Sequence, residues 1–579
     1  MKRYKKYITP YRNAFIIGPL LMLTEVFGEI MLPKLMSLII NNGIAGRDTG
    51  YVIRIGLVMA AIAVLMAVSG IGGAFFSAKA SICFTSDLRR DLFARVLQFS
   101  FKNIDTYSTG SLVTRLTNDI QQVQQVITMG LRLALRAPGM LIGALIMAFL
   151  MNSRLAVIIL IVVPLLTAAI AVILTTAFPR FTAMQKKLDQ LNNGIQEALT
   201  NVRVIKSFVR ESFEEEKFSR ANYELKESSL HAMKVVILTM PIMTLAMNIT
   251  TLAVVWYGGN LIIAGNMALG DLTAFTTYII QILLSLMLLS MVFLQSSRAM
   301  ASIKRIGEVL DTEIDLTDDA AGHRNQEVKS GRVEFKQVCF SYHPDGDGTV
   351  LKDISFTAEP GQVVGIVGAT GSGKTSLVQL IPRLYDVTAG QVLVDGVDVR
   401  DYSLHHLRDG VGMVLQKNVL FSGTIEENLR WGSENASLEE IRAAAADAQA
   451  DDFVGGFRDG YETDMGQGGV NVSGGQKQRL CIARALLKQP KILILDDSTS
   501  AVDTATEAGI REAFHTSLKD TTTFIIAQRI SSVEEADLIL VLDDGIMIGM
   551  GTHKQLMGTC EAYQEIYYSQ REKESEISA

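Results

Sequence analysis

The stretch VVGIVGATGSGKT, residues 363–375, decides the fold of the second half of the chain. An apolar, β-rich run leads into the pattern Gly-x-x-x-x-Gly-Lys-Thr, which begins at Gly368 and ends at Thr375. The glycines of such a loop let backbone N–H groups wrap around phosphates. Lys374 would then reach the β- and γ-phosphates, and the Thr375 hydroxyl would bind Mg²⁺. The stretch therefore predicts a strand, a phosphate-binding loop and a helix in succession.

The flanking sequence repeats this alternation of strand and helix. Short β-rich runs such as GQVLVDG, TTFIIA and LILVLDD are separated by helical stretches, which predicts an α/β domain with a largely parallel sheet. The run KILILD ends at Asp496, where a P-loop ATPase needs a carboxylate for Mg²⁺. A plain core strand that happens to end in aspartate is the alternative.

A second candidate anion site is the segment Ser473-Gly474-Gly475-Gln476, which precedes the helical run KQRLCIARALL. The N-terminus of a helix carries free N–H groups and a partial positive charge, so it attracts anions. One phosphate-binding domain does not need two such cradles for its own ligand. We therefore expect this segment to face a nucleotide bound to another subunit.

The first half of the chain has the composition of a membrane domain. Hydrophobic residues make up 49% of the chain and charged residues 20%, and the mean hydropathy is positive. Six apolar stretches are each long enough for about 30 Å of hydrocarbon, which predicts six membrane-spanning helices. They lie around 14–40, 56–82, 127–150, 155–178, 235–264 and 272–296. The net charge of −6 gives no reason to expect nucleic acid as a partner.

The basic residues of the loops predict the orientation. The N-terminal segment and the connections 83–126 and 179–234 are rich in lysine and arginine, whereas the opposite loops are short and carry few charges. The positive-inside rule places both chain ends in the cytoplasm, with the two long connections as helical hairpins on the same side. A solvated helical linker is the alternative for these hairpins.

The predicted organisation is an α-helical membrane domain fused to an α/β nucleotide-binding domain of the P-loop class. The boundaries follow the changes in composition. They are a membrane domain at 1–310, a polar linker at 311–330, the nucleotide-binding domain at 331–568 and a flexible charged tail at 569–579.

Taken together, these motifs resemble the ATP-binding-cassette (ABC) exporter family, and the resemblance covers nearly all 579 residues. It implies that the chain is a half-transporter that binds ATP and Mg²⁺ and works with a second half-transporter in a lipid bilayer. It also implies that the tips of the two hairpins, near 100–108 and 207–217, dock on the cassettes.

The resemblance assigns roles to further residues. Tyr342 resembles the aromatic residue that stacks on adenine, Gln416 resembles the Gln-loop residue that senses Mg²⁺ and the membrane domain, and Asp503 resembles the acid of the D-loop. Thr375, Gln416 and Asp496 are the implied metal ligands. The residues implied to contact nucleotide are Tyr342, Gly368, Ala369, Thr370, Gly371, Ser372, Gly373, Lys374, Thr375, Ser376, Gln416, Ser473, Gly474, Gly475, Gln476 and Asp503.

Two residues depart from the family pattern at the catalytic positions. Asp497 stands where the family has glutamate, and Gln528 stands where it has histidine. A general base must reach the attacking water at hydrogen-bond distance, and a displacement of about 1 Å can reduce the rate on the order of 10²-fold. We expect ATP binding to survive and hydrolysis at this site to be slow. The alternative is that Asp497 serves as an adequate base and Gln528 is tolerated.

A weak catalytic base beside an intact Ser473–Gln476 segment resembles one subunit of the bacterial heterodimeric exporters. The resemblance implies a non-identical partner that carries the glutamate and the histidine. Such an exporter would lie in the inner membrane of a bacterial-type cell, with its ATP-binding domain in the cytoplasm.

Several residues of the spans are candidates for substrate contact. Glu25 and Glu29 lie four residues apart on one helix face, and Arg132 and Arg136 have the same spacing in the third span. Either these charges pair within the bundle, or the glutamates attract cationic amphiphiles. In the last span, Tyr278, Gln281, Met287 and Met291 would line a cavity or form a packing stripe.

The leading functional hypothesis is ATP-driven export of hydrophobic or amphipathic compounds of the multidrug type. In it, two ATP molecules are held between two cassettes, and their binding and hydrolysis open and close the membrane cavity. A lipid or peptide exporter, possibly homodimeric, is one alternative. An ATP-gated channel or regulator is the other, because degenerate sites suit gating.

Overall fold

The computed structural model describes residues 2–318, 322, 325–342, 348–498 and 504–578. It forms two compact units. The first consists of Met1–Leu97 and Thr109–Thr312, and the second of Gln98–Ser108 and Glu313–Ala579. The first unit is helical, whereas the second contains both sheets of the chain's described part.

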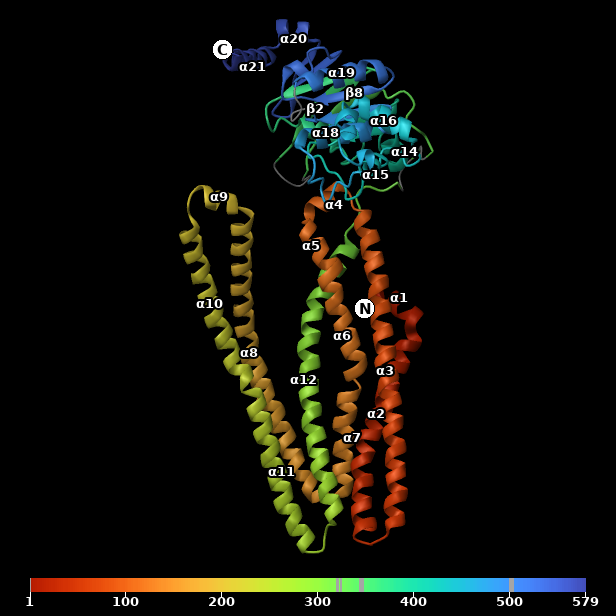
Figure 1. The fold of residues 1–579 in the computed structure, drawn as a ribbon, viewed down its shortest axis with the longest axis vertical. Coiled ribbons are helices and arrows are strands. Elements are labelled where there is room, and N and C mark those ends of the chain that lie inside the picture. The colour runs from red at the N-terminus through yellow and green to blue at the C-terminus, as the bar shows by residue number, and fades with distance from the viewer. Residues whose placement is uncertain (1, 319–321, 323–324, 343–347, 499–503, 579) are drawn as a thin grey trace. The chain divides into compact units, whose positions relative to one another are not determined.

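Long helices make up the first unit (Figure 1). Six helical stretches are long and apolar enough to cross a membrane, which confirms the six predicted spans. These stretches are Lys5–Ile44, Thr49–Leu97, Thr109–Met151, Ser153–Thr200, Glu211–Ile263 and Leu269–Leu289. The main helices are α2 (Arg12–Leu38), α3 (Thr49–Leu97), α5 (Thr109–Thr114), α6 (Ile120–Leu133), α7 (Arg136–Met151), α8 (Ser153–Thr200), α9 (Val202–Ser207), α10 (Glu211–Ile237), α11 (Thr239–Ile263) and α12 (Leu269–Asp311).

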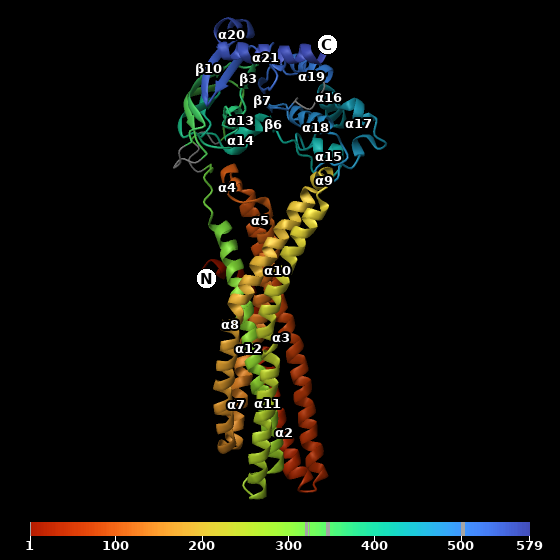
Figure 2. The same cartoon turned by 90° about the vertical axis from the view of Figure 1, so that its left-hand side faces the viewer.

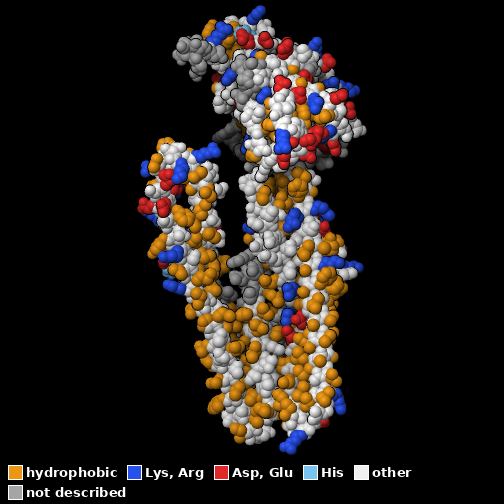
Figure 3. Space-filling model, viewed as in Figure 1, with side chains coloured by type: hydrophobic (Ala, Val, Ile, Leu, Met, Phe, Trp, Pro, Cys, Tyr) orange, Lys and Arg blue, Asp and Glu red, His pale blue; other side chains and the backbone are white. Residues whose placement is uncertain are grey.

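The spans pack against one another through one face and expose apolar side chains on the opposite face. Buried side chains of α2, α7, α8, α11 and α12 form one cluster around Phe275 and Ile282. The outer surface is also apolar, as Figure 3 shows, and it includes Leu57, Ile71 and Leu252, each about two thirds exposed or more. A water-soluble helix would not present such a surface, whereas a helix in lipid does. The membrane character predicted from composition is therefore visible in the fold.

Several helices are much longer than a bilayer requires. At 1.5 Å per residue, the 49 residues of α3 and the 48 of α8 would extend about 70 Å, more than twice the hydrocarbon thickness. Figures 1 and 2 both show α8 and α10 running side by side, with α9 at the tip of the hairpin. The ion pair between Lys187 and Glu224 joins the two helices at 2.7 Å.

The second unit contains two sheets. The antiparallel sheet has the strand order β2-β1-β4-β5, and the larger sheet has the order β10-β9-β3-β8-β7-β6, in which only β10 is antiparallel to its neighbour. The strands are β1 (Val333–Phe340), β2 (Leu351–Ala358), β3 (Val363–Gly368), β4 (Ala389–Val394), β5 (Val397–Asp398), β6 (Val411–Val414), β7 (Ile492–Asp496), β8 (Thr522–Ile526), β9 (Leu538–Asp543) and β10 (Ile546–Gly551). The predicted fusion of a helical membrane domain to an α/β domain with a largely parallel sheet is confirmed.

The central strands β7 and β8 of the larger sheet are buried along their whole length, because both faces of the sheet are covered there. In β7, Ile492 and Ile494 belong to one buried cluster, and Leu493 and Leu495 belong to the other. This alternation follows from the two-residue period of a strand. Helices of this unit include α13 (Lys374–Gln379), α16 (Leu438–Asp447), α18 (Gly474–Leu487) and α19 (Thr504–Ser517).

The short helix α4 (Phe101–Thr106) belongs to the second unit, although it lies between α3 and α5 in the sequence. Ser100 caps its N-terminus, and Asn103 Nδ2 donates a 3.1 Å hydrogen bond to the carbonyl oxygen of Glu313. Tyr385 donates a 2.7 Å hydrogen bond to Asp105 Oδ2. The predicted docking of the first hairpin tip is thus confirmed on this chain's own cassette, whereas docking of the second tip stays a prediction.

The boundaries of the structural elements differ in detail from the sequence estimate. Helix α12 ends at Asp311 and β1 begins at Val333, on either side of the predicted linker. At the C-terminus, helix α21 (Glu561–Ser578) occupies the segment for which the sequence suggests a flexible tail.

Candidate functional site

The candidate nucleotide site lies at the carboxyl ends of three adjacent parallel strands. Strand β8 lies between β3 and β7, and Ile526 of β8 pairs with Ile366 on one side and with Asp496 on the other. The phosphate-binding loop follows β3, Gln528 follows β8, and Asp496 ends β7. Ligands of open α/β sheets bind at this edge, and the topology brings these three segments together there.

The loop after β3 requires glycine at Gly373. Its φ is +94°, and a Cβ atom there would lie 2.8 Å from Leu351 Cδ2 and 3.1 Å from the carbonyl oxygen of Val350. No larger residue fits this space or this backbone conformation. The glycine pattern of the sequence therefore has a direct steric cause, and it turns the chain into α13.

Lys374 points back into this loop. Its Nζ donates hydrogen bonds to the carbonyl oxygens of Gly368 at 2.9 Å and Ala369 at 2.7 Å. Burial lowers the pKa of Lys374, while the nearby Asp496 and Asp497 act in the opposite direction. A half-buried ammonium held by neutral carbonyls is well suited to a phosphate, which would supply a negative charge.

Thr375 and Asp496 are adjacent. The threonine hydroxyl donates a 3.0 Å hydrogen bond to Asp496 Oδ1, and burial raises the pKa of this carboxyl group. A hydroxyl and one carboxylate are an incomplete set for a metal ion, and no group of three His, Cys, Asp or Glu side chains in the described residues could hold one. The pair fits Mg²⁺ that is shared with nucleotide phosphates, where the ion would neutralise phosphate charge.

Tyr342 lies beside α13, the helix that follows the phosphate-binding loop. Its hydroxyl is 2.8 Å from Ser376 Oγ, the residue after Thr375. Its ring contacts Phe340 and Tyr385 edge to face, with centroids 4.8 and 5.1 Å away. The ring is half-buried, so one part of it is available to stack on a base.

Asp497 and Gln528, the two residues that depart from the family pattern, contact each other. Gln528 Nε2 donates a 2.6 Å hydrogen bond to Asp497 Oδ2. Burial raises the pKa of Asp497, and hydrogen bonds from Gln528 and Gln416 oppose the shift. Gln416 therefore lies against the same carboxylate. Asp497 also has a φ of +50°, which is uncommon for a residue other than glycine.

The Ser473–Gln476 segment begins helix α18, as predicted. Ser473 Oγ accepts a hydrogen bond from the backbone N–H of Gln476, and Gln476 Oε1 accepts one from the backbone N–H of Ser473. Ser473 and Gly474 are exposed, and Gly475 is half-buried. The end of this helix is thus open at the surface, while Gln478 on its buried face donates to the carbonyl oxygen of Asp497 at 3.2 Å. Asp503 lies outside the described residues.

The charged residues of the spans form a cluster. Arg136 Nη2 lies 2.6 Å from Glu29 Oε1 and 3.3 Å from Glu25 Oε1, and Gln281 Nε2 donates to the carbonyl oxygen of Glu29 at 3.0 Å. Figure 3 shows acidic and basic side chains amid the apolar surface of this unit. Within the described residues, no hydrogen-bond partner meets the buried atoms Glu25 Oε2, Glu29 Oε2, Gln281 Oε1 and Arg136 Nε. The cluster pairs two carboxylates with one guanidinium.

The other candidates of the spans are placed differently. Tyr278 is fully buried, and its hydroxyl donates a 2.8 Å hydrogen bond to the carbonyl oxygen of Ile30. Met287 is partly buried against the same core, and Arg132 is exposed. The side chain of Met291 lies outside the described residues. Of the predicted substrate residues, the structure thus brings Glu25, Glu29 and Gln281 together.

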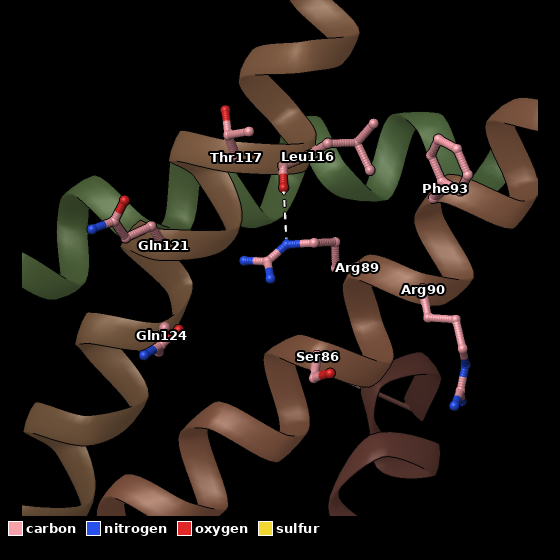
Figure 4. A pocket seen from close by; sticks show the side chains of 8 residues that line it. All are labelled: Ser86, Arg89, Arg90, Phe93, Leu116, Thr117, Gln121 and Gln124. Carbon is pink, nitrogen blue, oxygen red and sulfur yellow. Dashed lines mark hydrogen bonds between the residues drawn. The ribbon is translucent and has the colours of Figure 1, made fainter. Parts of the chain in front are cut away.

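A basic pocket was not anticipated from the sequence. It has a volume of about 640 Å³ and lies between α3 and the segment 116–124 (Figure 4). Arg89 and Arg90 line it, and Arg89 Nε donates a 3.2 Å hydrogen bond to the carbonyl oxygen of Leu116. The remaining lining residues are Ser86, Phe93, Leu116, Thr117, Gln121 and Gln124.

A signal for this pocket is present in the sequence. Ser86, Arg89 and Phe93 recur at helical spacing and therefore share one face of α3. Asp87 and Asp91 do not line the pocket. They accept hydrogen bonds from Tyr11 and from Lys6 and Tyr7, and they also pair with Arg90 at 3.4 and 3.8 Å. The pocket carries no carboxylate, so its charge preference is opposite to that of the Glu25–Glu29 cluster.

Comparison with known proteins agrees with both units. Residues 15–286 match the family model described as the ABC transporter transmembrane region, and residues 351–500 match the one described as ABC transporter. The chain is 41% identical over 578 residues to the uncharacterized ABC transporter ATP-binding protein YfiB of Bacillus subtilis, with all of both chains covered. It is 33% identical to the ATP-dependent lipid A-core flippase of Pseudomonas aeruginosa, covering 97% of this chain and 94% of that one.

A solved structure has the same fold. The chain superposes on a bacterial Atm1-family ABC exporter with ATP bound, with a TM-score of 0.77, 26% identity and 98% of each chain covered. The chain therefore belongs to the ABC exporters, multi-pass membrane proteins that couple an ATP-binding domain to transport and function as dimers.

Proposed function

We propose that this chain is one subunit of a heterodimeric exporter of amphipathic compounds, and that its own ATP site binds nucleotide but hydrolyses it slowly. The observation that carries the proposal is the hydrogen bond from Gln528 to Asp497. It ties the carboxylate of Asp497, in the position of a general base, to a neutral amide. The intact binding loop would preserve ATP binding, whereas the altered catalytic pair would slow hydrolysis.

The slow hydrolysis has two physical causes. Aspartate is one methylene shorter than the glutamate of the family pattern, so its carboxylate stands farther from the attacking water. Gln528 supplies one N–H to Asp497 and cannot become a cation, so it stabilises less of the charge that develops on the γ-phosphate. ATP and Mg²⁺ would still be held by Lys374, Thr375 and Asp496.

A non-identical partner follows from the difference between the two anion sites. The exposed N-terminus of α18, with Ser473 as its cap, would face ATP held by the binding loop of the partner. A partner with glutamate and histidine at the catalytic positions would then hydrolyse that ATP. Since the basic connections mark the cytoplasmic side, both cassettes would lie in the cytoplasm of a bacterial-type cell, below its inner membrane.

The Glu25–Glu29–Arg136 cluster favours cationic substrates. With both glutamates ionised, it carries one negative charge in excess, and a net charge at membrane depth is costly unless it is compensated. A protonated amine would supply the positive charge and also N–H groups for the unpartnered oxygens of Glu25, Glu29 and Gln281. A quaternary ammonium ion would supply the charge but no hydrogen-bond donor.

Export of a lipid is the second candidate. It is favoured by the 33% identity to a lipid A-core flippase over nearly the full length of both chains. A lipid substrate of that kind is anionic, so it would be repelled by the Glu25–Glu29 cluster and attracted by the pocket at Arg89.

Transport by the assembled transporter in proteoliposomes tests the proposal. We expect ATP-dependent accumulation of dodecylamine in vesicles with outward-facing cassettes, and no accumulation with ADP. Ion currents that persist without ATP turnover would instead support an ATP-gated channel. ATP-dependent movement of an anionic lipid without movement of dodecylamine would support the lipid exporter.

A further inference from the structure

Three aromatic rings connect the nucleotide site to helix α4, all within the second unit. Phe340, at the end of β1, is almost fully buried and fixes one side of the group. Its ring lies 4.8 Å from that of Tyr342 and 5.6 Å from that of Tyr385. The rings of Tyr342 and Tyr385 are 5.1 Å apart and nearly perpendicular, at 87°. A movement of either tyrosine ring therefore changes its contact with the other.

One end of this group lies at the nucleotide. The Tyr342 hydroxyl is within hydrogen-bond distance of Ser376 Oγ in α13, directly after the residues that would hold phosphate and Mg²⁺. The resemblance to the ABC exporters implies that an adenine ring stacks on Tyr342. Stacking restricts the orientation of Tyr342, because offset and edge-to-face geometries are favoured over others.

The other end lies at α4. Tyr385 donates a 2.7 Å hydrogen bond to Asp105 Oδ2, and its ring lies 6.1 Å from that of Phe101. Burial and the adjacent Asp105 raise the pKa of Tyr385, so its hydroxyl keeps its proton and remains a donor at neutral pH. Hydrogen bonds to ionised carboxylates are stronger than those between neutral groups.

The backbone beside Tyr385 is firmly held. Arg383 is buried, and its guanidinium donates to both oxygens of Asp386, at 2.7 and 3.1 Å. Arg408 in turn donates a 2.8 Å hydrogen bond to the carbonyl oxygen of Arg383. Because the neighbouring backbone is held in this way, a displacement of the Tyr385 ring by Tyr342 would be a side-chain rotation, and it would move the hydroxyl relative to Asp105.

We propose that Tyr385 is a positioning residue that couples adenine bound at Tyr342 to helix α4 through Asp105. Because α4 joins α3 to α5 along the chain, occupancy of this ATP site thereby biases the membrane helices without hydrolysis. The inference rests on the proposed function and extends it: a slowly hydrolysing site acts as a sensor of bound ATP. Such coupling is reciprocal, so a transported substrate must change nucleotide affinity at this site by the same factor.

The test measures that factor in the full transporter. This chain is labelled with photoreactive 2-azido-ATP at increasing concentrations, with and without dodecylamine, and separated from its partner by electrophoresis. The ratio of the two apparent affinities is the coupling factor. In Tyr385→Phe we expect the factor to fall by about two- to tenfold, the equivalent of one net hydrogen bond, with the affinity in the absence of amine unchanged.

Two further variants make the test specific. Tyr461 donates a 2.6 Å hydrogen bond to Asp451 elsewhere in the cassette, so Tyr461→Phe removes a matched bond and should leave the coupling factor intact. Asp105→Ala should lower the factor as Tyr385→Phe does, and the double variant should lose no more than either single variant.

The possible failures are distinguishable. Coupling that survives Tyr385→Phe, or a double variant with additive losses, would overturn the inference and leave the proposed function standing. An equal loss in Tyr461→Phe would also overturn it, because the effect would then be a general weakening of the cassette. Absence of any coupling in the unaltered transporter would contradict the proposed function itself.

Discussion

Gln528 and Asp497 are 31 residues apart in the sequence and are joined by a 2.6 Å hydrogen bond at the ends of the adjacent strands β8 and β7. The two residues are therefore one structural unit. Asp497 accepts a hydrogen bond from Gln528, and Gln416 contacts the same carboxylate. Restoring one residue without the other would leave a mismatched pair.

The first prediction concerns restoration of this pair. Asp497→Glu together with Gln528→His should raise hydrolysis at this chain's site by roughly 10- to 100-fold, because the base regains its reach and the γ-phosphate contact regains a group that can be protonated. Each single change should give a smaller gain. Site-specific ATPase is measured with the partner's catalytic glutamate changed to glutamine. A double variant no faster than the unaltered chain would refute this explanation of slow turnover.

The second prediction concerns pH. Burial raises the pKa of Asp497, and only the ionised carboxylate can accept a proton from water. Residual hydrolysis at this site should therefore rise with increasing pH, through a window that lies above the ordinary aspartate pKa of about 3.9. In Asp497→Asn the residual rate should lose this dependence. A pH profile shared by both proteins would show that Asp497 is not the titrating group.

The third prediction concerns the substrate. Glu25→Gln should weaken stimulation of ATPase by dodecylamine about tenfold or more, since it removes the excess charge while Arg136 keeps its shorter contact with Glu29. Dodecyltrimethylammonium, which has no N–H donor, should stimulate less than dodecylamine in the unaltered transporter.

Glu308→Gln is the matched control for this substitution. Glu308 also pairs with an arginine, Arg115 at 3.4 Å, but lies beyond the last membrane span in α12. Stimulation by dodecylamine should be normal in this variant. Equal stimulation of the Glu25→Gln variant and the unaltered transporter would remove the cluster from consideration as an amine site.

The fourth prediction separates packing from substrate contact. Tyr278 is fully buried and donates to the carbonyl oxygen of Ile30, so Tyr278→Phe should lower the stability of the membrane unit by about 1–3 kcal/mol. Amine stimulation should persist. The exposed Tyr223 supplies the control, since Tyr223→Phe should change little. Thermal unfolding in detergent measures the difference, and a selective loss of amine response in Tyr278→Phe would show a direct role in binding.

Local patterns of the sequence were sufficient for most of the fold. The apolar lengths of the spans, the glycines at 368 and 373 and the strand that ends at Asp496 are signals within short segments, and the structure realises each of them. The residues of the nucleotide site could be predicted from the same signals, because parallel strands bring their carboxyl ends to one edge of the sheet.

Contacts between segments that are distant in the sequence could not be predicted from local patterns. The spacing of Glu25 and Glu29 places them on one helix face, but their partner Arg136 comes from another helix. Arg132 has the same four-residue spacing from Arg136, yet its side chain is exposed. Likewise, no local pattern links Tyr385 to Asp105, which are 280 residues apart. These contacts depend on how helices and loops pack, which the period of one element does not specify.

The most direct test of the central claim is a single-turnover measurement on the assembled transporter. The transporter is loaded with radiolabelled ATP and Mg²⁺, the reaction is quenched over time, and the nucleotide bound to each chain is identified after photo-cross-linking. We predict rapid conversion of ATP to ADP at the partner's binding loop. This chain's Lys374 site should retain ATP for many times longer than that conversion takes. Equal rates of ADP formation at the two sites, or rapid hydrolysis by this chain assembled only with itself, would contradict the account.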